Sequence, residues 1–212
     1  MSDIKKIFDF TKFINKFKTL ERYVGATYWR EYPLEDRFES DADHTWRMAM
    51  ILSSLANRLS QPLDYKKAMD MLLIHDIPEI IAGDKNPMGE SGTGDDGHAF
   101  NKQKADLKFD NEKEAAKIIL KKLPDDLHGY YHGLWLEFEE QKSYEAKVVR
   151  AIDKLEGKLQ AYQMTGGKFY QTHHKFNMKY GVETFTADPI IKELGDLLLK
   201  EMEDNFTEYK PH

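Results

Sequence analysis

The feature of this sequence that most restricts its fold is the spacing of its apolar residues. Between positions 4 and 20, 41 and 59, and 143 and 162, apolar residues recur mostly at steps of three and four. This is the spacing of α-helices that pack through an apolar surface. No segment shows the sustained alternation of apolar and polar residues that predicts a half-buried strand. The sequence therefore predicts an all-α fold.

Capping residues and helix breakers predict where the helices begin and end. Asp41 or Asp43 caps a helix that stops before Pro62, and a second helix begins near Asp64. Pro78 predicts a kink or an end of that second helix, because proline lacks the backbone N–H. Further helices are expected at residues 111–122 and 125–140, from Ser143 to the glycine pair at 166–167, and at residues 189–204.

Two stretches carry no helical pattern. Residues 23–40 are expected to form a loop, and a glycine-rich stretch from about 84 to 109 a long irregular excursion. The 212 residues fit one domain, 1–212, and 41% hydrophobic with 32% charged residues is typical of a globular protein. We expect its core at about 10–165, with the C-terminal helix at about 189–204 packed on it.

Charge and cysteine content exclude several kinds of function. The formal net charge is −6 and the pI is near 5.8, which argues against a polymeric nucleic acid as partner. The absence of cysteine excludes disulfides, thiolate zinc sites and cysteine nucleophiles, so a bound metal must use nitrogen and oxygen ligands. Residues 1–20 lack a signal-peptide pattern, and no apolar run reaches membrane-spanning length. We therefore expect a cytoplasmic protein without a membrane partner.

Four polar residues interrupt the strongly apolar helices. His44 opens one central helix, His75 and Asp76 end the next, and Asp153 lies in a third. A buried carboxylate such as Asp153 needs a cation or hydrogen-bond donors, because burying it unpaired is costly. Imidazole and carboxylate ligands together suit Zn, Mn, Fe, Co or Ni better than Ca, which prefers oxygen alone. The four residues are therefore candidate ligands of one divalent metal.

The order of these residues resembles that of the HD-domain superfamily of metal-dependent phosphohydrolases. Three segments are similar to motifs of its small 5'-deoxynucleotidase branch: FESDADHTWRMA at 38–49, LLIHDIPEIIAGD at 72–84 and VRAIDKLE at 149–156. The resemblance covers residues from about 10 to 162. It implies an all-α HD-domain helical bundle with a long irregular excursion after the HD helix.

The resemblance also implies roles for individual residues. The metal ligands would be His44, His75, Asp76 and Asp153, and the catalytic carboxylates Glu79 and Asp84. Enzymes of this branch release phosphate from nucleoside 5'-monophosphates, and its small members are often homodimers. Cobalt, manganese, iron or zinc would satisfy the ligand set, with magnesium and nickel as further options.

The chemistry of these residue types agrees with those roles. A metal lowers the pKa of bound water from about 16 to near 7 in favourable sites. If the helix continues through Pro78, Glu79 lies four residues after His75 on the same face, and Asp84 follows Gly83 at a turn. One carboxylate would position or deprotonate the water, and the other would protonate the leaving 5'-oxygen. The sequence leaves open which carboxylate does which.

Cationic side chains near the motifs are candidates for binding the nucleotide. Arginine suits a phosphate, because its guanidinium group is planar, always charged and bidentate. The candidate arginines are Arg22, Arg30, Arg37 and Arg47. Trp29 and Arg30 have the reverse order of an Arg-Trp pair that approaches the nucleotide in related enzymes, so base and sugar selectivity stay open. Lys154, next to Asp153, is a further candidate phosphate contact.

Two alternative functions stay open. A related HD hydrolase of nucleoside triphosphates or guanosine polyphosphates would need a larger basic pocket than the few arginines around the motifs suggest. A non-catalytic regulator that binds a nucleotide or a metal would have no need of Glu79 and Asp84 beside the ligand set.

Other polar pairs are expected to take no part in the chemistry. His128 and His132 have the spacing of two ligands on one helical face, but lack the glutamate that a metalloprotease motif places after its first histidine. Three more groups are expected at the surface or in solvated loops: His173–His174, Asp95–Asp96, and Glu112 with Glu114 in the first turn of a helix.

Overall fold

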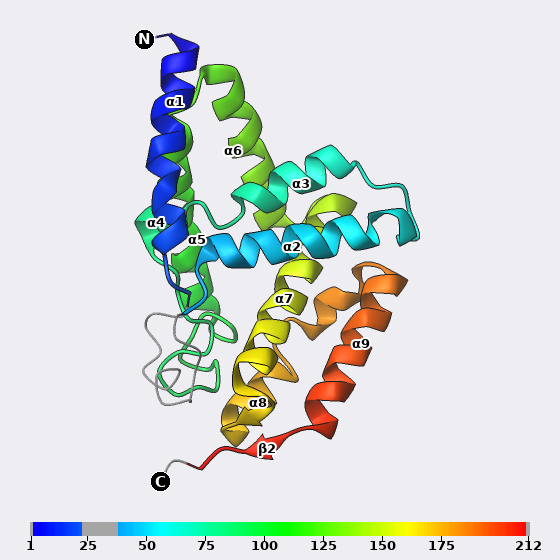
Figure 1. Ribbon diagram of the computed structural model, residues 1–212. Helices are drawn as coiled ribbons and strands as arrows, with labels where there is room; N and C mark the ends of the chain where they lie inside the picture. Colours follow the sequence, from blue (N-terminus) through cyan, green and yellow to red (C-terminus); the bar gives the residue numbers. More distant parts are fainter. Residues whose placement is uncertain (1, 23–37, 211–212) are drawn as a thin grey trace.

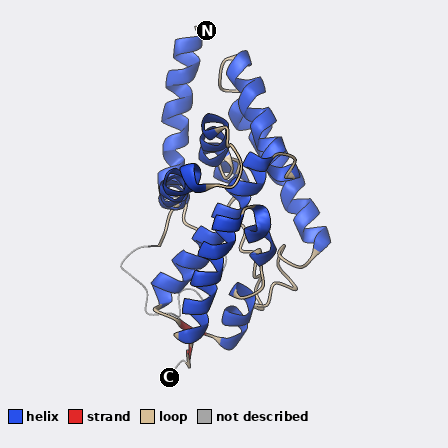
Figure 2. Cartoon of the chain, turned by 90° about the vertical axis from the view of Figure 1, so that its right-hand side faces the viewer, coloured by secondary structure: helices blue, strands red, loops and turns tan. Residues whose placement is uncertain are grey.

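The chain folds into packed helices with very little strand (Figure 1). The computed structural model describes residues 2–22 and 38–210. The only strands in these residues, β1 (Lys168–Phe169) and β2 (Thr207–Glu208), form one short parallel pair close to the C-terminal end (Figure 2). The all-α prediction is confirmed. None of the helices described is long and apolar enough to cross a membrane.

The helices and short 3-10 helices, the latter marked η, follow one another along the chain. Their order is α1 (Asp3–Phe13), η1 (Ile14–Thr19), α2 (Asp41–Leu55), η3 (Ala56–Arg58), α3 (Tyr65–Ile74), α4 (Glu79–Ala82), α5 (Lys102–Leu120), α6 (Asp125–Glu140), α7 (Tyr144–Thr165), α8 (Gln171–Asn177), η4 (Val182–Ala187) and α9 (Pro189–Asp204).

Helix α7 organises the packing. It contacts α2, α3, α6 and α9, and Figure 1 shows it running from the crossing of α2 and α3 into the lower half of the molecule. Ser143 caps its first turn by accepting a hydrogen bond from the Ala146 N–H, and Gly166 ends it with a φ of 58°. Its buried residues are apolar apart from Thr165 near its end and three charged side chains. These are Asp153, Glu156 and Lys158.

The helix ends near the HD motif follow local capping chemistry. Ser40 and Asp43 form a capping box at the start of α2, so Ser40 is the cap, in place of the expected Asp41 or Asp43. Asp64 caps α3 as expected. Helix α3 ends at Ile74, a turn follows over residues 75–78, and α4 begins directly after Pro78. The helix end predicted from this proline is confirmed.

One helix begins earlier than the sequence pattern indicates. Asn101 caps α5, so the helix starts at Lys102, where an irregular chain was expected up to about residue 109. The first turns of α5 are rich in charged residues and show no apolar period. The sequence pattern therefore gave no indication that a helix begins there. The expectation for Glu112 was therefore wrong, because Glu112 lies in the middle of α5, is buried and pairs with Lys108.

The two adjacent histidines of α8 also differ from expectation. His173 and His174 are buried, not at the surface. Nε2 of His174 lies 2.9 Å from a carboxylate oxygen of Glu203, and its ring stacks on Phe206 at a centroid distance of 4.0 Å. His174 thus packs α8 against the end of α9, whereas the ring of His173 contacts Tyr170.

The turn after α3 is held from the opposite side by α6. Trp135 is fully buried, and its indole Nε1–H donates a hydrogen bond to the backbone carbonyl of His75 at 3.1 Å. The indole also stacks on Phe109 of α5, with ring centroids 5.9 Å apart. This contact fixes the backbone of His75, and with it the start of the site described below.

Replacing Trp135 by phenylalanine tests that contact. The change removes the N–H that the buried carbonyl of His75 accepts from, so we expect the free energy of unfolding to fall by about 1–3 kcal/mol, measured by urea denaturation. Trp46→Phe is the matched control: Trp46 is 67% exposed, and its substitution should change the free energy by no more than about 0.5 kcal/mol. Equal losses in the two variants would contradict this assignment.

Candidate active site

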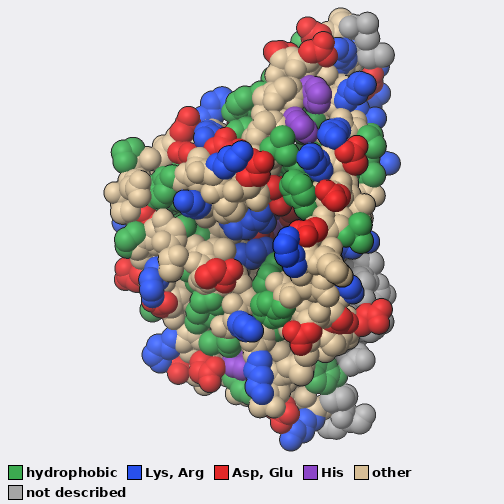
Figure 3. Space-filling model, turned by 180° about the vertical axis from the view of Figure 1, so that it is seen from behind, with side chains coloured by type: hydrophobic (Ala, Val, Ile, Leu, Met, Phe, Trp, Pro, Cys, Tyr) green, Lys and Arg blue, Asp and Glu red, His purple; other side chains and the backbone are tan. Residues whose placement is uncertain are grey.

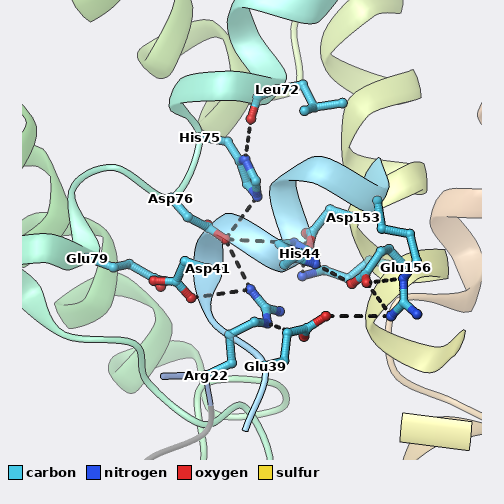
Figure 4. Close-up of polar contacts among 12 residues, drawn as sticks. Arg22, Glu39, Asp41, His44, Leu72, His75, Asp76, Glu79, Asp153 and Glu156 are labelled. Atoms are coloured by element: carbon cyan, nitrogen blue, oxygen red, sulfur yellow. Dashed lines mark hydrogen bonds and ion pairs between the residues drawn. The ribbon is translucent and has the colours of Figure 1, made fainter. Parts of the chain in front are cut away.

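Two imidazoles and two carboxylates from distant parts of the chain converge at one point (Figure 4). Nε2 of His44, on α2, lies 3.4 Å from Oδ1 of Asp153 on α7 and 3.8 Å from Oδ2 of Asp76. Nε2 of His75 lies 2.9 Å from the same oxygen of Asp76. The two imidazole centroids are 5.5 Å apart. The fold thus brings together the four residues that the sequence singled out as ligands.

The other ring nitrogen of each histidine determines where its proton sits. Nδ1 of His75 lies 2.7 Å from the carbonyl oxygen of Leu72, which only accepts, so Nδ1 carries the hydrogen. Nδ1 of His44 likewise hydrogen-bonds to a carboxylate oxygen of Glu156. In both rings this arrangement leaves the lone pair of Nε2 facing Asp76 and Asp153.

The buried lone pairs and carboxylates call for a cation between them. Neither Nε2 atom makes a hydrogen bond in the described part of the chain, although both are buried and carboxylate oxygens lie as close as 2.9 Å. A lone pair directed at a carboxylate is repulsive unless positive charge lies between the two. Two imidazole nitrogens and two carboxylates form a donor set that fits a divalent transition metal. The Nδ1 atom of each imidazole is held by a hydrogen-bond acceptor, as is usual for histidine ligands.

The ionisation of these groups follows from their neighbours. Burial raises the pKa of Asp153, but Lys154 and His44 outweigh burial and hold that pKa well below its usual range. Burial likewise raises the pKa of Asp76, and His75 and Arg22 reverse the shift. For His44, burial lowers the pKa, while Glu156 and Asp153 raise it, with a net value of about 10. Without a metal, a proton on Nε2 of His44 supplies the positive charge.

Glu156 is itself fixed by an arginine. Nε of Arg47 donates to a carboxylate oxygen of Glu156 at 2.7 Å, and the remaining guanidinium nitrogens donate to Gln160 and Gln163 at 2.6 and 2.7 Å. Burial raises the pKa of Glu156, but His44 and the arginines lower it to about 2, so the carboxylate stays charged. Arg47 was a candidate substrate contact. In the structure its side chain binds Glu156 and does not line the cavity described below.

A second group of carboxylates lies beside the first. Oxygen atoms of Asp41, Glu79 and Asp84 lie within 4.8 Å of one another. Burial and the charges of Asp76 and Asp84 raise the pKa of Glu79 well above its ordinary value. Burial, with a contribution from Asp76, raises the pKa of Asp41 to about 8. Asp41 therefore holds a proton at neutral pH, and Glu79 keeps its proton to a higher pH than an ordinary glutamate, in contrast to the charged Asp76.

Arg22 joins the two carboxylate groups. Its Nη1 atom lies 3.3 Å from Oδ2 of Asp76 and 3.8 Å from Oδ1 of Asp41. Its Nε atom lies 3.2 Å from Oε2 of Glu39. Its side chain is 9% exposed. Of the candidate substrate contacts, Arg22 is therefore brought to the site, whereas Trp29, Arg30 and Arg37 lie outside the described residues.

A cavity of about 320 Å³ opens onto both groups. Asp76, Asp153, Glu79 and Asp84 line it, and Met88, Phe109, Phe176 and Tyr180 supply apolar and aromatic walls. Its cationic residues are Arg22, Lys85, Lys108, Arg150, Lys154 and Lys158. Figure 3 shows a recess near the middle of one face in which basic and acidic side chains meet. Glu112 and Glu139 also line it, so the cavity places cationic side chains beside an equal number of acidic ones.

Sequence reasoning found one of these lysines and missed others. Lys154 was expected, and its Nζ lies 2.9 Å from Oδ2 of Asp153. Arg150 and Lys158 were not considered, although they lie four residues before and after Lys154, which places the three on one helical face. Lys108 was missed because its segment was assigned to the irregular excursion.

The chain is similar to known proteins over most of its length. A family model described as HD domain matches residues 15–194. Two curated proteins named 5'-deoxynucleotidase HDDC2 are similar: that of Dictyostelium discoideum is 29% identical over 182 residues, covering 84% of each chain, and that of Homo sapiens is 31% identical over 181 residues, covering 78% of this chain and 79% of its own.

A solved structure supports the fold. It is described as a predicted metal-dependent phosphohydrolase from Magnetospirillum magnetotacticum, covers 97% of both chains and has a TM-score of 0.71 at 24% identity. The family match spans most of the chain and includes all three motif segments. We conclude that this chain belongs to the HD-domain family.

Proposed function

We propose that the protein is a metal-dependent phosphohydrolase that releases phosphate from deoxynucleoside 5'-monophosphates. The observation that carries this proposal is that the buried Nε2 atoms of His44 and His75 face the carboxylates of Asp76 and Asp153 and make no hydrogen bond within residues 2–22 and 38–210. The adjoining cavity has both cationic and aromatic walls, which suits a phosphate ester with a base. The printed names of the relatives support the choice of a 5'-deoxynucleotide as substrate.

The ligand chemistry supports a first-row transition metal. His44, His75, Asp76 and Asp153 would hold it, and cobalt, manganese, iron or zinc all suit two imidazoles and two carboxylates, with magnesium and nickel as further options. When bound, such a metal supplies a Lewis acid that makes water a better nucleophile at neutral pH and polarises the phosphoryl group.

The side chains around the cavity supply the remaining steps. Lys154 and Arg22, each beside a proposed ligand carboxylate, bind and orient the phosphate. Water attacks phosphorus, the bond from phosphorus to the 5'-oxygen breaks, and that oxygen takes a proton. Burial raises the pKa of Glu79 well above its ordinary value, so we assign Glu79 as the proton donor to the 5'-oxygen. Asp84, in the same cluster, would receive the proton of the water.

We also propose that the protein works as a homodimer in the cytoplasm. The exposed apolar residues of α1 support self-association, because Ile4 and Phe8 lie four residues apart on one helical face and are 77% and 56% exposed. Sedimentation equilibrium tests the dimer, and cell fractionation tests the location.

Replacing Asp76 by asparagine tests the metal centre. The change removes one ligand charge, so we expect metal content, measured by inductively coupled plasma mass spectrometry, to be lost and kcat to fall by more than about 100-fold. Asp110→Asn, on the exposed side of α5, is the matched control and should keep both. Full turnover in a folded, metal-free Asp76→Asn protein would refute the proposed centre.

Proton release on metal binding tests the role of His44. Its pKa of about 10 means that the metal-free ring is protonated at neutral pH, and a ligand nitrogen must give that proton up. We expect release of about one proton from this ring per metal, and an affinity that weakens as pH falls. Calorimetric titration in buffers of different ionisation enthalpy measures the release. A metal affinity independent of pH between 6 and 8 would contradict the assignment.

Replacing Glu79 by glutamine tests the proton donor. An amide cannot donate an acidic proton, so we expect kcat to fall by about 100- to 10,000-fold while metal content is kept. The raised pKa of Glu79 also predicts that wild-type activity declines as pH rises through that value, because the donor is then ionised. The glutamine variant should lose this decline. Glu114→Gln, at an exposed position of α5, is the control, and an unchanged pH profile in Glu79→Gln would refute the role.

A further inference from the structure

The cavity continues along α7 beyond the proposed metal centre. Arg150, Lys154 and Lys158 all line it, and their four-residue spacing keeps them on the same side of the helix. Lys154 lies directly beside Asp153. Lys158 is one turn further, about 6 Å along the helix axis from Lys154. A row of cations therefore leads away from the position proposed for the released phosphate.

The three cations differ in how their charges are compensated. Arg150 pairs with Glu139 at 3.1 Å, and Lys154 pairs with Asp153 at 2.9 Å. Lys158 is only 3% exposed, and no carboxylate lies within 4.0 Å of its Nζ in the described ranges 2–22 and 38–210. Its Nζ donates to the backbone carbonyl of Tyr180. Burying an ammonium group without a counter-charge is costly, which an anion in the cavity would offset.

The surroundings of Lys158 are suited to such an anion. Asn177 and Tyr180 line the same part of the cavity wall from α8 and the segment that follows it. Burial and the charge of Lys154 lower the pKa of Lys158 to about 7. An anion beside Nζ would raise this pKa again and keep the side chain charged.

We propose that Lys158 is a specificity-determining residue that binds a second phosphate group carried by the same nucleotide, in addition to the 5'-phosphate released beside Asp153. This inference rests on the proposed function and narrows its substrate class to nucleotides with an extra phosphate. A single phosphate bound next to Lys154 leaves Lys158, one turn away, without a counter-charge. Because the proposed reaction breaks the bond to the 5'-oxygen and releases a single phosphate, the second phosphate is attached at the 3' carbon of the sugar.

The test compares three substrates on the full-length protein with Mn²⁺: 2'-deoxyadenosine 5'-monophosphate, its 3',5'-bisphosphate and its 5'-diphosphate. We expect the 3',5'-bisphosphate to exceed the monophosphate in kcat/KM by about tenfold or more, as a charge-assisted hydrogen bond to a buried lysine implies, whereas the 5'-diphosphate should not exceed it. Lys158→Met should abolish this preference and leave the monophosphate within about twofold. Lys147→Met, at an exposed position of α7, is the matched control and should change nothing.

Binding measured without turnover separates this inference from the proposed function. Calorimetry in the presence of EDTA should show Lys158→Met weakening the binding of the 3',5'-bisphosphate and not of the monophosphate. If this difference is found but no substrate loses phosphate, the proposed function fails and the second site stands.

The opposite outcome overturns the second site alone. If the monophosphate is hydrolysed and Lys158→Met affects all three substrates equally, or none, the second site is refuted. An equal loss together with a lower melting temperature would identify the lysine as only a structural link to Tyr180.

Discussion

The structure depends on an electrostatic conflict at the point where α2, α7 and the turn after α3 meet. Two buried imidazole lone pairs face two carboxylates, and positive charge between them stabilises this arrangement. In the free protein a proton on His44 can supply that charge. The same site is therefore both the main electrostatic strain in the fold and the reason that a metal would bind there.

The surrounding residues divide into two sets with opposite ionisation. Asp76, Asp153 and Glu156 stay charged because cations lie against them, whereas burial and neighbouring carboxylates raise the pKa of Glu79 and of Asp41. Metal ligation and proton donation need these different states. A single cluster of acids can thus serve both purposes, since burial and the nearest charged groups set the ionisation of each acid.

Much of this could be predicted from the sequence, because caps, breakers and motif order are local properties. Pro78 marked the end of α3, and the proposed ligands were chosen from three short segments before their distances were known. The partner of His44 was missed: Glu156 belongs to the third motif, but its pairing depends on how α2 crosses α7. The hydrogen bond from Arg47 to Glu156 was missed for the same reason. The position of Arg47 in the first motif does not indicate which residue of α7 it contacts.

Helix α7 carries Asp153 and Glu156 toward the histidines, and Lys154 and Lys158 line the substrate cavity. Because both sets belong to one rigid element, their relative positions are fixed by helical geometry and not by flexible loops. Residues of the second set can be exchanged without altering the spacing of the first. The choice of nucleotide can therefore diverge within such a scaffold while the reaction centre keeps its form, and α7 is the place to redesign selectivity.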